Sequence, residues 1–116
     1  MVLTGAKLVF VDIRPDTMNI DEKLIESAIT PKTKLLVLPF PNNPTGAIME
    51  RADLEAIVDL IIEKDIFVIS DEIYAELTYN GGHVSIASLP GMKERTIVIS
   101  GFSKAFAMTG WRLGYA

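Results

Sequence analysis

The sequence predicts an α/β fold built on a parallel sheet, because short apolar runs rich in β-branched residues alternate with helical stripes. Three runs read as buried strands: Leu35–Leu38, Ile66–Ile69 and Thr96–Ile99. Continuous runs of this kind are typical of strands covered on both faces. From Leu54 to Ile62, apolar residues recur at i, i+3, i+4, i+7 and i+8, which is the spacing of one helix face. A helical bundle would not use such short β-branched runs between Gly and Pro.

Further elements are expected before and between these. Lys7–Ile13 is predicted to be a strand. Asn19 and Glu22 have the spacing of a capping box, so a helix is predicted to begin there and to stop before Pro31. Pro39–Gly46 is dense in turn residues and is predicted to be a loop.

The composition excludes several classes of function. The chain has 116 residues, 11 Lys and Arg, 15 Asp and Glu, and a net charge of −4, whereas nucleic-acid binding needs a basic patch. With no cysteine and one histidine, disulfide scaffolds, thiolate metal sites and His-rich zinc sites are excluded, and no metal is expected. The longest apolar runs fall far below the ~20 residues of a membrane helix. The first residues show no signal-peptide pattern, so we expect a cytoplasmic location.

The chain is more apolar than its length suggests. Hydrophobic residues make up 49% and charged residues 22%, although a domain of this size buries only roughly two-thirds of its surface. We therefore expect the chain either to associate with itself, as a homodimer or a higher assembly, or to be part of a larger core.

Polar residues follow each predicted buried strand. The carboxyl ends of neighbouring parallel strands meet at one edge of a sheet, where ligands bind in open α/β folds. The residues expected to converge there are Asn42 and Asn43 after the first strand, Ser70, Asp71, Glu72 and Tyr74 after the second, and Ser100, Ser103 and Lys104 after the third, with Arg112 eight residues beyond Lys104.

This set of groups matches the needs of pyridoxal phosphate. The aldehyde of that cofactor requires a lysine amine for a Schiff base. Its pyridine nitrogen requires a carboxylate that keeps it protonated as an electron sink. Its ring oxygen requires hydrogen-bond donors, and its phosphate suits a planar guanidinium.

Three motifs carry a family resemblance: Asn42–Gly46, Ser70–Tyr74 and Ser103–Tyr115. In type, order and spacing they resemble class I/II aminotransferases of fold type I, most closely the branch of bacterial aspartate and aromatic aminotransferases. The resemblance implies a three-layer α/β/α fold with a mostly parallel sheet. It also implies that residues 1–116 form a central fragment of the large, cofactor-binding domain, without the N-terminal segment and the C-terminal small domain.

The resemblance further implies a role for each site residue. Lys104 would be the catalytic lysine, binding the cofactor aldehyde and moving a proton to and from the substrate. Asp71 would pair with the pyridine nitrogen. Tyr74 and Asn43 would hydrogen-bond the ring oxygen, and Arg112 would hold the phosphate.

One position departs from the family pattern. Family members often place a serine three residues before the lysine, where it contacts the phosphate, and here that position is Gly101. Ser103 or Ser100 could supply the missing hydroxyl, so Ser103 is included among the candidate cofactor-binding residues. Of the other polar residues, Glu72 is expected to be a structural neighbour of Asp71, and His83 a solvated loop residue.

The resemblance implies a whole protein that moves an amino group from an L-amino acid to a 2-oxo acid, while the fragment alone is expected to be inactive. Two alternatives remain open at this point: a pyridoxal-phosphate lyase of the same fold acting on C–S bonds or at the β-carbon, and a non-catalytic, effector-sensing domain of a transcription regulator. Asp71 and Glu72 after an apolar strand also fit the magnesium site of a nucleotide hydrolase, but the chain lacks the phosphate loop that such an enzyme needs.

Overall fold

The computed structural model describes residues 4–116. Its helices and strands follow one another as α1 (Glu22–Ala28), β1 (Leu35–Leu38), α2 (Arg51–Glu63), β2 (Phe67–Asp71), β3 (Thr96–Gly101), α3 (Phe102–Ala105) and β4 (Gly114–Tyr115). Short 3-10 turns fill the connections: η2 (Ala75–Leu77), η3 (Ile86–Ser88), η4 (Lys93–Arg95) and η5 (Thr109–Trp111). The α/β fold expected from the sequence is confirmed.

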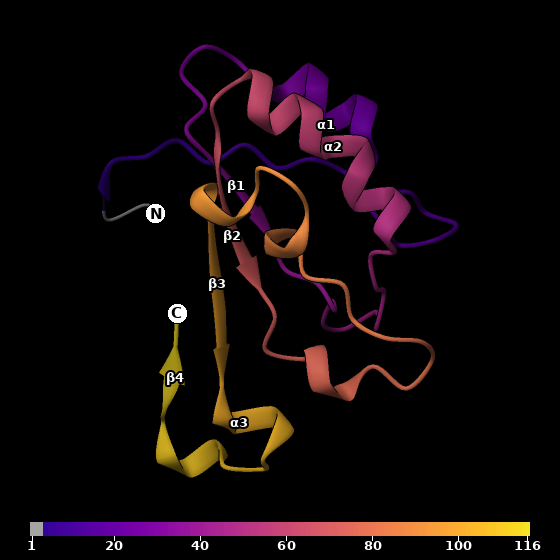
Figure 1. Cartoon of the computed structure of the whole chain (residues 1–116), viewed down its shortest axis with the longest axis vertical. Helices are drawn as coiled ribbons and strands as arrows, with labels where there is room; N and C mark the ends of the chain where they lie inside the picture. The colour runs from indigo at the N-terminus through magenta and orange to yellow at the C-terminus, as the bar shows by residue number, and fades with distance from the viewer. Residues whose placement is uncertain (1–3) are drawn as a thin grey trace.

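The four strands form one sheet in the order β1-β2-β3-β4. The first three are parallel, with Val37 beside Ile69 and Asp71 beside Ile99. The short β4 runs antiparallel to β3, where Gly114 pairs with Gly101. Figure 1 shows β1, β2 and β3 running toward the same end of the molecule, so their carboxyl ends share one edge.

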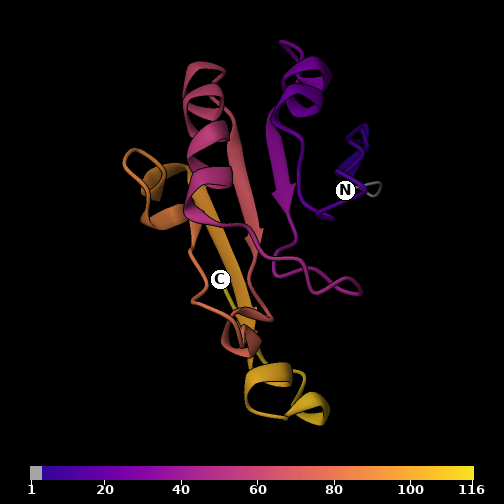
Figure 2. The same ribbon diagram turned by 90° about the vertical axis from the view of Figure 1, so that its right-hand side faces the viewer.

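Helix α2 begins with a capping box, in which the Glu50 backbone N–H donates to Asp53 Oδ2 over 2.9 Å. Its apolar stripe is buried at Leu54, Ile57, Val58 and Ile61, as the spacing predicts. Ile62 lies at the border of the stripe and is 39% exposed. Helix α2 therefore packs along one face of the sheet (Figure 2).

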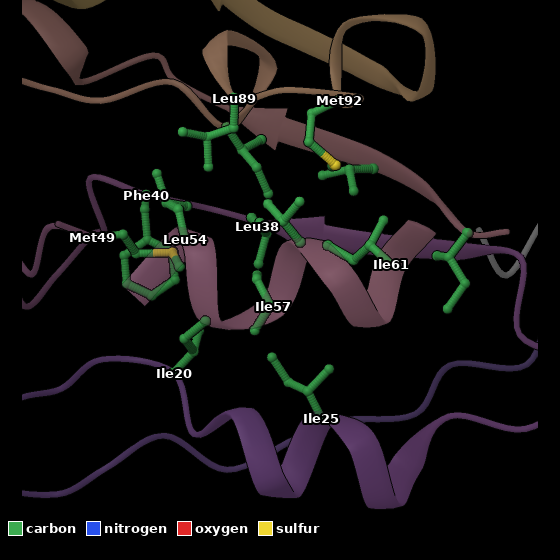
Figure 3. Packing of buried hydrophobic residues seen from close by; sticks show 14 residues of the cluster. Ile20, Ile25, Leu38, Phe40, Met49, Leu54, Ile57, Ile61, Leu89 and Met92 are labelled. Carbon is green, nitrogen blue, oxygen red and sulfur yellow. The ribbon is translucent and has the colours of Figure 1, made fainter. Parts of the chain in front are cut away.

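The hydrophobic core lies between α2, the sheet and α1. Ile57 and Ile61 of α2 join Leu38 of β1 and Ile25 of α1 in one buried cluster (Figure 3). Val68 of β2 is fully buried in the same cluster. Fully burying such a side chain contributes about 1.5–3 kcal/mol, so these contacts hold α2 on the sheet.

The second face of the sheet carries no helix within residues 4–116. Val37, Phe67, Ile97 and Ile99 point to this face and remain 37% to 51% exposed. The apolar runs of β1, β2 and β3 predict cover on both faces. Within the described residues, helical cover lies on only one, because α2 packs on the side of Val68.

The strand expected over Lys7–Ile13 does not form. This segment belongs to no helix or strand, and Phe10 is 89% exposed. A strand needs a neighbour for its backbone N–H and C=O groups, and no strand of the described residues pairs with it. The prediction was wrong because apolar composition alone does not supply a pairing partner.

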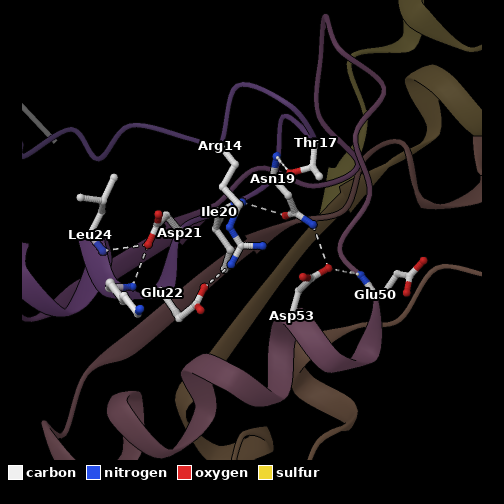
Figure 4. A network of polar contacts seen from close by, with 10 residues as sticks. Arg14, Thr17, Asn19, Ile20, Asp21, Glu22, Leu24, Glu50 and Asp53 are labelled. Carbon is white, nitrogen blue, oxygen red and sulfur yellow. Dashed lines mark hydrogen bonds and ion pairs between the residues drawn. The ribbon is translucent and has the colours of Figure 1, made fainter.

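The capping box expected at Asn19 and Glu22 is also wrong, because Asp21 is the N-cap of α1. Its Oδ1 accepts hydrogen bonds from the backbone N–H groups of Lys23 and Leu24. Glu22 instead pairs with Arg14 (Figure 4).

The side chain of Asn19 does not cap α1, because it binds other partners. Its buried amide nitrogen donates to Asp53 Oδ2 over 2.8 Å and to the Ile48 carbonyl over 3.2 Å (Figure 4). Asn19 thus joins the chain before α1 to the capping box of α2. No helix of the described residues is long and apolar enough to cross a membrane.

Candidate functional site

Two loops meet where β1 and β2 end. The loop after β1 carries Asn43, and the turn after β2 carries Tyr74 as the residue before η2. Asn43 Nδ2 donates a hydrogen bond to the Tyr74 phenol oxygen over 3.2 Å. Residues 31 positions apart in the sequence therefore touch at the edge where the sequence predicts a site.

Lys104 reaches the same place from the third strand. Helix α3 follows β3 directly, and it presents Lys104 so that Nζ lies 5.2 Å from the centroid of the Tyr74 ring. A cation over an aromatic face is attracted by the electron density of the ring. The amide of Asn43, the phenol of Tyr74 and the amine of Lys104 thus form one continuous set of contacts.

Asp71 is the last residue of β2 and is half-buried. Side chains alternate along a strand, so Asp71 points to the open face of the sheet, as its neighbour Ile99 does. Its Oδ1 accepts a hydrogen bond from the backbone N–H of Ile73 over 3.2 Å. Among residues 4–116, no hydrogen bond to its second carboxylate oxygen is found.

Arg112 is not joined to the other predicted site residues. It follows η5 with a positive φ of 53°, and its Nη1 donates to the Thr109 carbonyl over 3.2 Å. Within the described part of the chain, no hydrogen bond or ion pair links Arg112 to Lys104 or Tyr74.

Gly101, at the position where the resemblance leads one to expect a serine, lies against the backbone of Leu113 and Gly114. Gly101 pairs with Gly114, and a Cβ at Gly101 would lie 3.0 Å from the Leu113 carbonyl oxygen and 3.1 Å from Gly114 Cα. The backbone of β4 therefore occupies the space that a side chain at this position would need. Ser103 is half-buried in α3, one residue before Lys104.

A buried polar cluster, not anticipated from the sequence, surrounds Glu72. Glu72 Oε1 accepts hydrogen bonds from Ser70 Oγ over 2.9 Å and from Ser85 Oγ over 2.6 Å. His83 Nε2 lies 2.8 Å from Glu72 Oε2. The expectation that His83 is a solvated loop residue is wrong, because its side chain is only 17% exposed and faces this carboxylate.

The cluster also affects the ionisation of Glu72. Burial has the largest influence and raises the pKa of Glu72, but the contacts with His83, Ser85 and Ser70 together outweigh it and hold the pKa below its ordinary value. Glu72 is a structural neighbour of Asp71, as the sequence predicts. The spacing of Ser70 and Glu72, two residues apart and hence on one side of the strand, could have revealed the cluster.

The fold and these strand-end residues define an α/β protein with a lysine-centred site at the carboxyl edge of a parallel sheet. The profile of the family "Aminotransferase class I and II" matches residues 1–116. The chain therefore belongs to the class I and II aminotransferase family. Members of this family use pyridoxal phosphate.

Individual relatives agree with this assignment. The chain is 48% identical over 119 residues to aromatic-amino-acid aminotransferase 2 of Thermococcus litoralis and, over the same length, to an aspartate aminotransferase of Pyrococcus abyssi. Each match covers 99% of this chain and 30% of the relative. A double mutant of Thermus thermophilus aspartate aminotransferase superposes with a TM-score of 0.91 at 43% identity, over 97% of this chain and 29% of that one. The chain thus spans between 20% and 30% of the length of the curated relatives it matches.

Proposed function

We propose that the whole protein is a pyridoxal-phosphate-dependent aminotransferase that moves an amino group from an L-amino acid to a 2-oxo acid. The observation that carries this proposal is the meeting of Asn43, Tyr74 and Lys104 at one edge of the sheet, each from a different strand end. Membership of the class I and II aminotransferase family supports the same reaction.

The donor set fits the cofactor. Lys104 would bind the aldehyde, Asp71 the ring nitrogen, and Tyr74 with Asn43 the ring oxygen. Arg112 is the proposed phosphate ligand, and Ser103 a second one. When bound, pyridoxal phosphate supplies an electron sink for the bonds around the substrate α-carbon.

The chain's own residues then have distinct tasks. The Asp71 carboxylate favours a proton on the ring nitrogen, because an opposite charge nearby stabilises the charged form. The Lys104 amine takes a proton from the substrate α-carbon and can return one, as general bases do. Asn43, through its hydrogen bond to Tyr74, fixes where the phenol points.

The remaining features of the proposal concern the whole molecule. Residues 1–116 are proposed to be the central part of a large cofactor-binding domain, and the active protein is proposed to be a cytoplasmic homodimer or higher assembly. The names of the relatives favour acidic and aromatic amino acids as the first substrates to test. The 116-residue chain alone is expected not to transaminate, because catalysis needs its contacts held within about 0.5 Å.

The test is an assay of the whole protein with a panel of amino acids and 2-oxo acids. Formation of a new amino acid is the expected result. Release of ammonia without a 2-oxo acid acceptor would indicate a lyase, and no turnover with any pair would indicate a sensor domain; either result overturns the proposal.

Variants at two lysines sharpen this test. Lys104→Ala is expected to abolish the absorbance of lysine-bound cofactor and nearly all turnover. Lys93→Ala is the matched control, because Lys93 is exposed in η4, and it is expected to retain both signals. A normal cofactor spectrum in Lys104→Ala would remove Lys104 from its proposed role.

A further inference from the structure

Asp71 and its neighbour Glu72 face opposite sides of the sheet, and only Glu72 is locked in place by buried contacts. We propose that Glu72 is a positioning residue, which anchors the end of β2 from the covered side and thereby fixes Asp71 on the open side and Tyr74 at the start of η2. This inference rests on the proposed function, because it assigns Asp71 to the cofactor.

The contacts of Glu72 are those of an anchor. Its side chain is 8% exposed, and both carboxylate oxygens have partners. One oxygen accepts from the hydroxyls of Ser70 and Ser85, and the other lies 2.8 Å from His83. Since Ser85 and His83 belong to the chain after η2, Glu72 ties the end of the strand to a distant loop.

The backbone of Glu72 is fixed as well. Its N–H donates to the Ile99 carbonyl of β3 over 2.8 Å, and its carbonyl accepts from the N–H of Ala75 over 3.0 Å, where η2 begins. The first bond holds the residue on the sheet, and the second closes the turn that contains Tyr74. Glu72 therefore restrains the backbone on both sides, at Asp71 and at the turn that contains Tyr74.

Successive side chains at the end of β2 point to opposite faces of the sheet, so a contact of Glu72 on the covered face restrains Asp71 on the open face. Ser70 and Glu72 point to the covered side, and Asp71 points to the open side. The Asp71 side chain has one hydrogen bond within the described chain, from the Ile73 N–H at 3.2 Å. Its direction is therefore set mainly by its backbone, and Glu72 restrains that backbone.

A ligand at Glu72 would compete with contacts that the carboxylate already has. Its Oε1 accepts from two hydroxyls, its Oε2 lies 2.8 Å from the His83 imidazole, and its side chain is 8% exposed. The role of Glu72 is thus to act through Asp71 and Tyr74.

The test uses the whole protein loaded with pyridoxal phosphate and follows the pH midpoint of the cofactor absorbance. A positive charge on the ring nitrogen disfavours a proton on the nitrogen that joins Lys104 to the ring. Asp71→Asn weakens that positive charge and is expected to raise the midpoint by about one unit. Glu72→Gln is expected to raise it in the same direction, and the double variant is expected to match Asp71→Asn alone.

A second readout needs no cofactor. The Ile73 amide donates to Asp71, so Glu72→Gln is expected to speed hydrogen exchange at Ile73 roughly tenfold, by a loosening of about 1.4 kcal/mol. Asn19→Ala is the matched control, since it breaks a different buried polar contact, with Asp53. It is expected to lower the unfolding temperature without moving the midpoint.

The possible results distinguish a failure of the inference about Glu72 from a failure of the proposed function. A wild-type midpoint in Glu72→Gln, or shifts that add in the double variant, would overturn the inference and leave the proposed function standing. A cofactor spectrum unchanged in Lys104→Ala would overturn the proposed function, and the inference with it. If Glu72→Gln does not fold, Ser85→Ala removes one donor from Glu72 and must show a smaller shift in the same direction; no shift there overturns the inference.

Discussion

The side-chain amide of Asn43 donates a hydrogen bond to the phenol oxygen of Tyr74 across 3.2 Å. This bond joins the loop after β1 to the turn after β2, and the same Tyr74 ring lies 5.2 Å from the amine of Lys104. Tyr74 is therefore the point at which three strand ends come into contact.

Loss of this bond is expected to weaken cofactor binding more than it weakens the fold. Tyr74→Phe keeps the ring under Lys104 but removes the hydroxyl, and Asn43→Ala removes the donor. A net hydrogen bond is worth about 0.5–1.5 kcal/mol, so each variant is expected to raise the dissociation constant of pyridoxal phosphate by up to about tenfold.

Equilibrium dialysis of the whole protein against pyridoxal phosphate measures this effect. Because the two residues share one bond, the double variant is expected to lose less than the sum of the single variants. Tyr79→Phe is the control, since Tyr79 is 86% exposed. Affinities equal to that of the wild type in both single variants and in the double variant would show that Asn43 and Tyr74 do not touch the cofactor.

The elements predicted correctly from the sequence are those with a local cause. The strands β1, β2 and β3 were predicted from short continuous apolar runs, and α2 was predicted from the helical spacing of its apolar residues. The segment at Lys7–Ile13 needs a pairing partner that the described chain does not contain, so its composition was misleading. The motifs of the site were informative because strand ends of a parallel sheet converge whatever lies between them.

The residues predicted incorrectly are those whose partners are distant in the sequence. Asn19 has the chemistry of a cap, but Asp53, 34 positions away, competes for its amide. His83 follows two glycines and resembles a solvated loop residue, whereas Glu72, on another element, draws it into a buried cluster. Local patterns cannot reveal such competition between partners.

The stability of the fold is expected to depend on acid through Glu72. Its pKa in the folded protein lies below the ordinary value of 4.5, so the folded state binds fewer protons there than the unfolded state. The stabilisation is then fully present above pH 4.5 and is lost as the pH falls through the folded pKa. His83 faces this carboxylate directly, and Glu76 and Tyr115 are the other titratable residues that line one pocket together with Glu72 and His83.

Urea unfolding between neutral and acid pH measures this dependence. Glu72→Gln is expected to be less stable at neutral pH by about 1–3 kcal/mol, since it loses charged contacts in a buried place, and to show a flatter decline in acid. Glu94→Gln is the control, because Glu94 is exposed in η4. An acid decline in Glu72→Gln as steep as that of the wild type would contradict the assignment.

The pairing of β3 with β4 is expected to require glycine at position 101. In Gly101→Ala the new Cβ would lie 3.0 Å from the Leu113 carbonyl oxygen, which accepts the N–H of Phe102. Separating the two strands is expected to cost about 1–3 kcal/mol and to speed hydrogen exchange at Phe102.

Gly110→Ala provides the comparison, because no heavy atom lies within 4 Å of a Cβ at that position. Thermal unfolding and exchange at Phe102 are expected to match the wild type in that variant. The same result in Gly101→Ala would mean that β4 moves aside without cost, and that the serine common in the family could be accommodated here.

The 116-residue chain is expected to self-associate when studied alone. One face of its sheet leaves Phe67 and Ile97 51% and 47% exposed, and the outer edge of β1 pairs with no strand of the described residues. Unpaired edges and uncovered apolar faces promote pairing between chains.

The energies favour association at modest concentration. Each large apolar side chain that becomes fully buried contributes ~1.5–3 kcal/mol, so a few of them offset the ~4–15 kcal/mol that association costs in lost freedom of motion. A net charge of −4 opposes this only weakly.

Sedimentation of the chain at low micromolar concentration is expected to show a dimer or a larger species. Ile97→Lys places a charge on the open face and is expected to shift the equilibrium toward the monomer. Leu24→Lys, on the outside of α1 and 42% exposed, should leave the association unchanged. A compact monomer for the wild-type chain, independent of concentration, would show that the open face and edge do not drive pairing.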